Sequence, residues 1–266
     1  MTYLGKRFIP KGKTQLGYTI GGKAEQLNNI REKLVPDYVV IPTEVGESEL
    51  SEVVCEAYIS LGFPYVLEAK YAVRSSAVGE DGEGQSYAGI FESKLNVPIT
   101  GIETAVREVR ASAKTTRAKE YLQSMGKVMM RHDEDFLKDV SPDVAVIVMH
   151  MVDAQYSGVL FSKEPVDGTN RMLVEYEEGV GGVVDGTGNS TMLYLGSKEF
   201  SIQREQASMP VSLTEQMIEP LKVIWKEAKR LENNYRKPVD IEWAIDKEGN
   251  PWVLQVRPIT AMKETA

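Results

Sequence analysis

The sequence has few of the residues that build disulfides, metal centres or membrane segments. Among 266 residues there is one cysteine, Cys55, so no intramolecular disulfide can form, and we expect a buried, inert thiol on a helix. The two histidines, His132 and His150, lie far apart and do not suggest a zinc site. No run reaches the ~18 apolar residues of a membrane span, and the N-terminal residues lack a signal-peptide pattern. We therefore expect a cytoplasmic protein with no membrane partner.

Positive charge is also scarce. The 31 Lys and Arg residues are outnumbered by 39 Asp and Glu, which gives a formal net charge of -8. This balance argues against a broad surface for nucleic acid or anionic lipid, so a phosphate site must be a local cluster of cations. The hydrophobic content of 42% is ordinary for a globular protein, and the length suits one large domain or two small lobes.

Residues 239–260, VDIEWAIDKEGNPWVLQVRPIT, have the pattern of a β-hairpin, with two β-prone runs around a Lys-Glu-Gly-Asn turn. Side chains alternate across a strand, so counting outward from a turn at 247–250 sorts them into two faces. The polar face carries two cross-strand pairs, Glu242–Gln255 and Asp240–Arg257. The apolar face carries three, Ile241–Val256, Trp243–Leu254 and Ile245–Trp252.

The polar face has the chemistry of a magnesium-bound polyphosphate site. Mg²⁺ prefers hard oxygen ligands and retains water, which suits the Glu242 carboxylate and the Gln255 amide. The planar guanidinium of Arg257 matches phosphate oxygens. An ordinary surface ion pair on an exposed strand face is an equally good interpretation of the spacing alone.

The motif D-I-E-W-A-I-D followed by L-Q-V-R-P-I-T resembles the nucleotide-binding domain of phosphoenolpyruvate synthase and pyruvate phosphate dikinase, of the ATP-grasp class. The resemblance implies an α+β fold of two lobes with mainly antiparallel sheets, flanking helices and the nucleotide between the lobes. It also implies that Glu242 and Gln255 hold the metal ions on ATP and that Arg257 contacts its phosphates. Asp240, on the same strand face, is assigned to the nucleotide site.

The motif Gly21-Gly22-Lys23 precedes a helix-like run over residues 24–34. Backbone amides at a glycine-rich helix start attract anions, and Lys23 adds a point charge. A flexible loop before a surface helix would give the same pattern. However, I-G-G-K-A-x-x-L resembles the opening of the same family, in which the lysine reaches the ATP phosphates.

Residues 71–89, YAVRSSAVGEDGEGQSYAG, predict a strand that delivers Arg74 to a run of small residues. Small residues such as Ser75 and Ser76 let a backbone approach a triphosphate closely. A disordered acidic loop is the alternative. The segments V-R-S-S-A-x-x-E-D and S-Y-A-G resemble the most distinctive motif of the family, in which the arginine binds phosphates and the loop covers them.

The middle of the chain predicts a helix over 100–125, then two strands within 143–161. The motif T-R-A-K-E-Y makes Arg117 the counterpart of the second phosphate-contacting arginine of the family. The strand region resembles the adenine pocket, which assigns four consecutive residues to the cofactor, Met149, His150, Met151 and Val152. His150 replaces the usual glutamine, and a histidine packed in the core is its alternative interpretation.

The next strand, 172–176, ends near Glu175 and leads into a glycine-rich stretch. The family has G-L-G-E there, whereas this chain has Gly182 in place of the acid, so Glu175 or Glu178 is a candidate substitute. A capping box beginning at Ser212 predicts a helix to about residue 233, bent or restarted at Pro220.

The resemblance implies an N-terminal lobe over residues 1–140 and a C-terminal lobe over 141–266, together one stand-alone ATP-grasp unit. It implies a kinase-type transferase that moves a phosphoryl or pyrophosphoryl group from Mg-ATP to an acceptor outside the chain. The acceptor is a small molecule or a separate phosphohistidine domain, because neither His132 nor His150 has the setting of the catalytic histidine of the family. The alternatives are an ATP-grasp ligase acting through an acyl phosphate, and a non-catalytic ATP-sensing subunit, which the missing acid at Gly182 favours.

Overall fold

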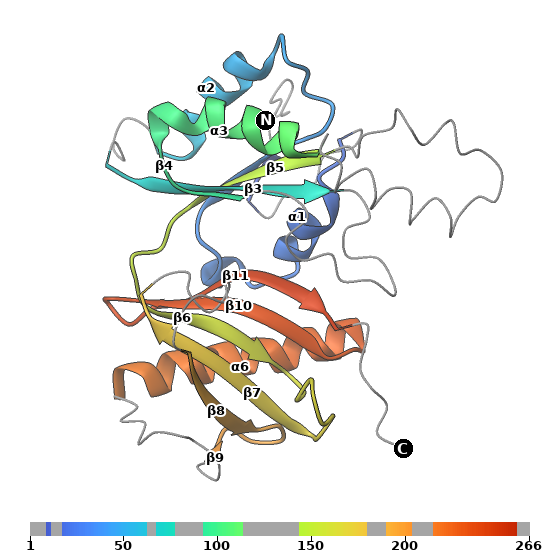
Figure 1. Cartoon of the computed structure of the whole chain (residues 1–266), viewed down its shortest axis with the longest axis vertical. Helices are drawn as coiled ribbons and strands as arrows, with labels where there is room; N and C mark the ends of the chain where they lie inside the picture. Colours follow the sequence, from blue (N-terminus) through green and yellow to red (C-terminus); the bar gives the residue numbers. More distant parts are fainter. Residues whose placement is uncertain are drawn as a thin grey trace, which may run out of the picture. The chain divides into compact units, whose positions relative to one another are not determined.

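The computed structural model describes residues 9–11, 18–62, 68–77, 93–113, 144–179, 190–203 and 215–259 (Figure 1). The chain divides into two compact units. Unit 1 comprises Met1–Asn28, Asp37–Gly82 and Ser86–Met151, and unit 2 comprises Asn29–Pro36, Glu83–Gln85 and Val152–Ala266.

Unit 1 is built on a five-stranded antiparallel sheet. Its strands, in spatial order, are β1 (Ile9–Pro10), β2 (Tyr38–Ile41), β5 (Val144–His150), β3 (Lys70–Ala77) and β4 (Ser93–Pro98). The helices α2 (Leu50–Ser60) and α3 (Ile102–Ser112) cover one face, and α1 (Gly21–Asn28) lies on the other (Figure 1). A short 3₁₀ turn, η2 (Ile99–Gly101), leads from β4 into α3.

Alternation along the strands decides what each face of this sheet carries. The face toward α2 and α3 forms an apolar core with the buried stripes of both helices. The strand residues of this core are Val39, Ile41, Tyr71, Val73, Val97, Val146 and Val148. The intervening residues, including Arg74, Ser76 and Met149, therefore face the side of α1.

Unit 2 is built on a six-stranded antiparallel sheet. Its strands, in spatial order, are β11 (Pro251–Pro258), β10 (Val239–Asp246), β6 (Ala154–Phe161), β7 (Arg171–Glu178), β8 (Thr191–Gly196) and β9 (Ile202–Gln203). The helix α6 (Glu215–Tyr235) packs against β10 and β11, and runs without a break through Pro220. A 3₁₀ turn, η1 (Glu32–Leu34), also contacts β11.

The core of unit 2 lies between α6 and one face of its sheet. Ile241, Trp243 and Ile245 alternate along β10 and are fully buried, together with the apolar stripe of α6 that includes Leu221 and Ile224. Gly158 of β6 stands beside Trp243 in the register. A Cβ at Gly158 would lie 2.0 Å from the carbonyl oxygen of Glu175, so only glycine allows β6 and β7 to approach this closely.

The predicted α+β class with two mainly antiparallel sheets and flanking helices is confirmed. Strands β8 and β9 were not predicted, although T-M-L-Y-L is a β-prone run. The division between the units falls after Met151 rather than after residue 140, because β5 pairs with β2 and β3 in the first sheet. None of the helices in the described ranges is long and apolar enough to cross a membrane.

Two helix predictions differ from the structure. The helix expected over residues 24–34 ends at Asn28, because the following residues pack in unit 2. Of the helix expected over 100–125, the structure describes residues 100–113: the first two belong to η2, α3 follows, and residues 114–125 lie outside the described residues.

The prediction that Cys55 is buried was wrong: its thiol is exposed. The buried stripe of α2 is formed by Leu50, Val53, Val54 and Ala57. At about 100° per residue, position 55 falls on the solvent side of that stripe.

Candidate functional site

The β10–β11 hairpin places its polar pairs as predicted. Glu242 lies opposite Gln255 and Asp240 lies opposite Arg257, with Ile241 opposite Val256 on the other face. Beyond Glu242 the predicted register was wrong. An irregularity between Glu242 and Trp243 shifts the pairing, which becomes Trp243–Val253, Ala244–Trp252 and Ile245–Pro251.

The turn explains the shift. The Asp246 carboxylate accepts hydrogen bonds from the backbone N–H of Asn250 (2.7 Å) and of Glu248 (3.1 Å), and from the Trp252 indole N–H (2.9 Å). The backbone N–H of Asp246 also bonds the Asn250 carbonyl, so the turn closes one residue earlier than predicted. The extra residue on β11, Leu254, is taken up as a bulge.

These hydrogen bonds also set the ionisation of the turn. Burial raises the pKa of Asp246, but the hydrogen bonds donated by Trp252, Asn250 and Glu248 outweigh it and hold the pKa below its usual value. The carboxylate is therefore ionised near neutral pH and fixes the hairpin that carries the polar pairs.

A charged cluster occupies the hairpin face that points away from α6. The Arg257 guanidinium lies 2.9 Å from a Glu242 carboxylate oxygen (Nη2 to Oε1) and 3.4 Å from an Asp240 carboxylate oxygen (Nε to Oδ1). Glu242 is 6% exposed and Gln255 is 4% exposed. A carboxylate this deeply buried is costly unless it is paired, and Arg257 supplies the compensating charge.

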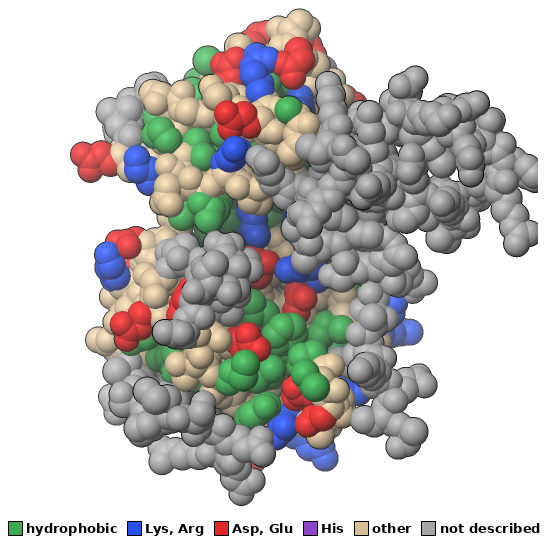
Figure 2. Space-filling view, viewed as in Figure 1, with side chains coloured by type: hydrophobic (Ala, Val, Ile, Leu, Met, Phe, Trp, Pro, Cys, Tyr) green, Lys and Arg blue, Asp and Glu red, His purple; other side chains and the backbone are tan. Residues whose placement is uncertain are grey.

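The neighbouring strands extend this face across the sheet. Glu242 lies beside Val159 of β6, and Val159 lies beside Glu175 of β7, so the two glutamates share one transverse row two strands apart. The structure therefore brings Asp240, Glu242, Gln255, Arg257 and Glu175 onto one face of unit 2. Figure 2 shows hydrophobic side chains gathered over this unit with acidic side chains among them.

The donor set fits a magnesium ion carried by a polyphosphate. Glu242 and Gln255 offer a carboxylate and an amide oxygen directly across the strand pair. No group of three or more His, Cys, Asp or Glu side chains suited to a metal occurs in the described ranges. Two oxygen donors are the small number of protein ligands that Mg²⁺ takes when phosphate oxygens and water complete its coordination.

The second set of predicted residues lies in unit 1, where α1 starts directly on β3. The Ala24 backbone N–H donates to the Ser76 hydroxyl at 3.0 Å. Gly21 has a φ of 70°, and a Cβ there would lie 2.1 Å from the Ser76 carbonyl oxygen. Only glycine permits this approach, so the first glycine of the G-G-K motif fixes the start of the helix on the strand.

This contact groups the predicted phosphate-binding residues of unit 1. Lys23 lies in the first turn of α1, and Arg74 lies two residues before Ser76 on the same face of β3. Ser75 faces the opposite side, where its hydroxyl is buried without a hydrogen-bond partner in the described part of the chain.

The end of β5 separates the predicted adenine-pocket residues. Met149 is buried and pairs with Ala72 on the face that carries Arg74. His150 faces the other way, with its Nε2 atom 3.1 Å from the Leu61 carbonyl oxygen and its ring 4.7 Å from the Tyr71 ring. The His150 side chain is therefore a packing contact at the end of α2.

The two residues that follow belong to different units. Met151 is the last residue of unit 1. Its backbone N–H donates to the Lys70 carbonyl oxygen, and its sulfur accepts a hydrogen bond from the Asn96 backbone N–H. Val152 begins unit 2. Arg117, Gly182 and the loop over residues 78–92 lie outside the described residues.

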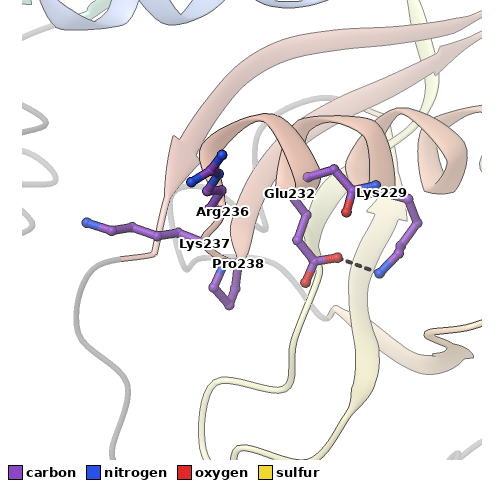
Figure 3. A pocket seen from close by; sticks show the side chains of 6 residues that line it. Lys229, Glu232, Arg236, Lys237 and Pro238 are labelled. Atoms are coloured by element: carbon purple, nitrogen blue, oxygen red, sulfur yellow. Dashed lines mark hydrogen bonds and ion pairs between the residues drawn. The ribbon is translucent and has the colours of Figure 1, made fainter.

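Unit 2 also has a shallow pocket of about 350 Å³ at the end of α6 (Figure 3). Lys229 and Glu232 on its wall form an ion pair at 2.6 Å. The other lining residues are Asn233, Arg236, Lys237 and Pro238. This pocket contains none of the residues predicted to bind nucleotide or metal.

Comparison with known proteins decides the family. Residues 24–211 and 190–266 match the family described as pyruvate phosphate dikinase, AMP/ATP-binding domain. The chain belongs to this family. Membership agrees with the predicted ATP-grasp-like α+β fold, and it confirms the resemblance that the hairpin motif indicated.

The curated relatives of this dikinase-domain chain are longer proteins. A probable phosphoenolpyruvate synthase from Archaeoglobus fulgidus is 32% identical over 79% of this chain and 29% of its own length. A second, from Methanothermobacter thermautotrophicus, is 30% identical over 85% of this chain and 35% of its own length. The uncharacterized phosphotransferase YvkC of Bacillus subtilis is 29% identical over 75% of this chain and 26% of its own length. The chain thus spans about a third or less of these three relatives.

Solved structures with a related course of the chain include an ADP complex of N5-carboxyaminoimidazole ribonucleotide synthetase. It is 12% identical, and the match covers 89% of this chain and 47% of the synthetase chain, with a TM-score of 0.42. A D-alanyl-alanine synthetase A from Vibrio cholerae is 12% identical, and the match covers 88% of this chain and 57% of the synthetase chain, with a TM-score of 0.40. Scores this low carry no argument about the function of the dikinase-domain chain.

Proposed function

We propose that the chain is an ATP-dependent phosphotransferase that moves a phosphoryl or pyrophosphoryl group from Mg-ATP to an acceptor outside the chain. The observation that carries the proposal is the charged cluster of unit 2, in which Glu242 faces Gln255 and Arg257 pairs with Glu242 and Asp240. Family membership supports the nucleotide, and the names of the relatives support the transferase class.

Each residue of the cluster has a proposed role. Glu242 and Gln255 hold the metal ion, which when bound neutralises charge on the phosphates. Arg257 contacts a phosphate oxygen and stabilises charge that develops during transfer. Asp240 keeps Arg257 in place when Glu242 turns to the metal, because it is the second carboxylate beside the guanidinium.

The cations of unit 1 have a matching role. We assign Lys23, Arg74 and Arg117 to the phosphates, with the Ser75–Ser76 backbone and the start of α1 as neutral donors. Met149, Met151 and Val152 are assigned to the adenine side, and His150 contributes through its backbone because its side chain faces α2. Glu175 is assigned to the nucleotide because it shares the face of Glu242.

Phosphoryl transfer needs mainly positioning and electrostatic stabilisation, so the chain requires no nucleophilic side chain of its own. The acceptor is then a small molecule or a histidine outside these 266 residues. A histidine acceptor agrees with the length of the phosphoenolpyruvate synthases among the relatives, which extends well beyond this domain.

The test is the fate of ATP labelled separately on its β and γ phosphates. The purified chain is incubated with Mg²⁺, alone and with a cell extract that supplies acceptors, and EDTA is the control. Mg²⁺-dependent AMP formation is expected and indicates pyrophosphoryl transfer. ADP formation indicates simple phosphoryl transfer, to be separated from a ligase by acceptor screening. Tight ATP binding without turnover in both conditions would overturn the proposal in favour of a non-catalytic role.

A further inference from the structure

Strand β7 begins with a cation, Arg171, whose place in unit 2 follows from the register of the sheet. Arg171 pairs with Gly196 of β8, and four residues later Glu175 pairs with Met192. Since side chains alternate along a strand, Arg171 and Glu175 lie on the same face. This is the face that carries Glu242, so Arg171 belongs to the same surface as the charged cluster.

Arg171 lies one step beyond the cluster along the strands. Leu173, two residues further on in β7, is in one transverse row with Phe161, Asp240 and Arg257. With strands about 4.8 Å apart and about 3.3 Å per residue along a strand, the Cα atoms of Arg171 and Asp240 are about 12 Å apart. Arg171 and Arg257 are the only Lys or Arg residues in the six described strands of this sheet.

Two contacts hold the Arg171 guanidinium. Its Cζ atom lies 3.8 Å from the centroid of the Tyr194 ring, and its Nη2 donates to the Asp167 carboxylate at 3.1 Å. A guanidinium that stacks on a ring keeps its in-plane N–H groups available for hydrogen bonds. Asp167 is its one hydrogen-bond acceptor among the described residues, and the side chain is 28% exposed. The fork is therefore oriented and still accessible to a ligand.

The loop that leads into β7 is fixed by a buried carboxylate. Glu164 is 4% exposed, and its Oε2 accepts the backbone N–H groups of Val166 at 2.9 Å and Asp167 at 2.5 Å. At the other end of the loop, the Ser197 hydroxyl donates to the Asn170 carbonyl oxygen at 2.7 Å. Both ends of the loop are thus tied down before the strand begins.

Stability alone does not account for this arrangement. Two hydrogen bonds from Thr169, by its hydroxyl at 2.6 Å and its backbone N–H at 2.8 Å, are the largest causes that lower the pKa of Asp167 to about 2, and the charge of Arg171 contributes less. A partly exposed ion pair such as Arg171–Asp167 stabilises a fold little, whereas burying the Glu164 carboxylate is costly. What the braced loop adds is a fixed direction for the Arg171 guanidinium.

We propose that Arg171, stacked on Tyr194, binds an oxyanion of the acceptor, an inference that rests on the proposed function. The acceptor is then a small molecule that carries a phosphate or a carboxylate, since the guanidinium fork matches both groups. The two arginines of the face divide the anions between them. Arg257 contacts the phosphates of ATP, and Arg171 holds the acceptor further along the sheet and selects it by its charge.

The first test measures anion binding without nucleotide, so its result does not depend on turnover. Inorganic phosphate and acetate are titrated separately into the full chain, and the amide chemical shifts of residues 171–175 and 191–196 are followed by NMR. We expect saturable shifts with at least one of the two anions. Shifts with phosphate alone indicate an acceptor that carries a phosphate, and shifts with acetate alone indicate a carboxylate.

Three variants make the titration specific. Arg171→Gln is expected to raise the Kd of the anion at least about tenfold, because hydrogen bonds to a charged group are lost. Tyr194→Leu removes the ring that orients the guanidinium and is expected to raise the Kd by a smaller factor. The control, Lys222→Gln, removes one positive charge from α6 and is expected to leave the Kd unchanged. Thermal unfolding confirms that each variant is folded, and Arg171→Lys replaces Arg171→Gln if that variant does not fold.

The second test asks whether this anion site serves the acceptor. Turnover of Mg-ATP is measured with increasing amounts of cell extract as the source of acceptors. In Arg171→Gln, the amount of extract that gives half-maximal turnover is expected to rise at least about tenfold, while the KM for ATP stays unchanged. A general loss of stability would not move one of these parameters without the other.

The contrary results are distinct. No shift near Arg171 with either anion, or an equal Kd in Arg171→Gln and Lys222→Gln, would overturn the oxyanion site. An unchanged extract requirement in Arg171→Gln, or turnover that needs only the macromolecular fraction of the extract, would overturn its role toward the acceptor. A wild type that binds the anion through Arg171 but never turns over ATP would overturn the proposed function and still support the anion site.

Discussion

The two clusters of site residues are built in opposite ways. In unit 2, side chains on neighbouring strands pair with one another, as Arg257 does with Glu242 fifteen residues away. In unit 1, backbone geometry sets the arrangement: α1 starts on β3 through Gly21 and a hydrogen bond between Ala24 and Ser76, fifty-two residues apart. One cluster depends on charge and the other on close approach.

This difference predicts how each cluster fails. Removing Arg257 takes away the ion-pair partner of the buried Glu242, which lowers stability, but the strand ladder and the α6 core still hold the hairpin, so the larger loss falls on chemistry. Adding a methyl group at Gly21, at the start of α1, forces the backbone to move away from β3, so the free energy of unfolding falls before the chemistry is affected. The four predictions below test this contrast, from the largest expected effect to the smallest.

Arg257→Ala is expected to lower kcat by about 10²–10³-fold, with a smaller change in ATP affinity, because the guanidinium acts mainly on charge that develops during transfer. The measurement is steady-state turnover together with ATP binding. Lys247→Ala is the control, since this lysine is on the same hairpin and pairs with the exposed Asp153. Equal turnover in the two variants would remove Arg257 from the site.

Glu242→Ala is expected to raise the Mg²⁺ concentration needed for half-maximal activity at least about tenfold, because a direct ligand should matter no less than an outer-shell partner. Activity is titrated with Mg²⁺ at fixed ATP. Glu248→Ala, which changes a carboxylate in the turn of the same hairpin, is the control. An unchanged Mg²⁺ dependence in Glu242→Ala would contradict its role as a ligand.

Gly21→Ala is expected to lower the free energy of unfolding by about 1–3 kcal/mol, because the new Cβ meets the Ser76 carbonyl at 2.1 Å and φ is 70°. Denaturant unfolding measures the change. Gly46→Ala is the matched control, since a Cβ there meets nothing within 4 Å. A loss of the same size in both variants would mean that the contact with β3 is not the cause.

Asp246→Asn is expected to destabilise the hairpin by about 1 kcal/mol near neutral pH. The pKa of Asp246 is lowered in the folded protein, so its contribution is present above the unfolded value of about 4 and is lost as pH falls through the folded value. The difference in unfolding free energy between wild type and variant should therefore shrink below about pH 4. Asp153→Asn, at an exposed position, serves as the surface control, and a gap independent of pH would contradict the assignment.

The sequence predicted the hairpin face because its pairs are local. A strand alternates with a period of two, so one turn position placed Glu242 opposite Gln255 and Asp240 opposite Arg257. The bulge at Leu254 escaped prediction because it depends on how Asp246 closes the turn through Asn250 and Trp252. Such side-chain capping of a turn has no fixed spacing in the sequence.

Other features were out of reach because they are non-local. The residues that follow α1 belong to unit 2, where Arg230, two hundred residues away, bonds the Asn29 carbonyl. The orientation of His150 toward Leu61 follows from the pairing of β5 with β3, and no property of the isolated strand reveals it. The family motifs placed the chemistry on the chain, whereas only the folded strands show which side chains share a face.

The position of β11 at the edge of its sheet has a consequence for solubility. An edge strand offers unpaired backbone groups to any other extended chain and so invites aggregation. Here Pro251 begins the strand and Pro258 ends it, and proline has no backbone N–H to donate. A strand approaching this edge would meet a missing donor at each end, so the edge that carries Gln255 and Arg257 is poorly suited to recruit a second copy into an intermolecular sheet.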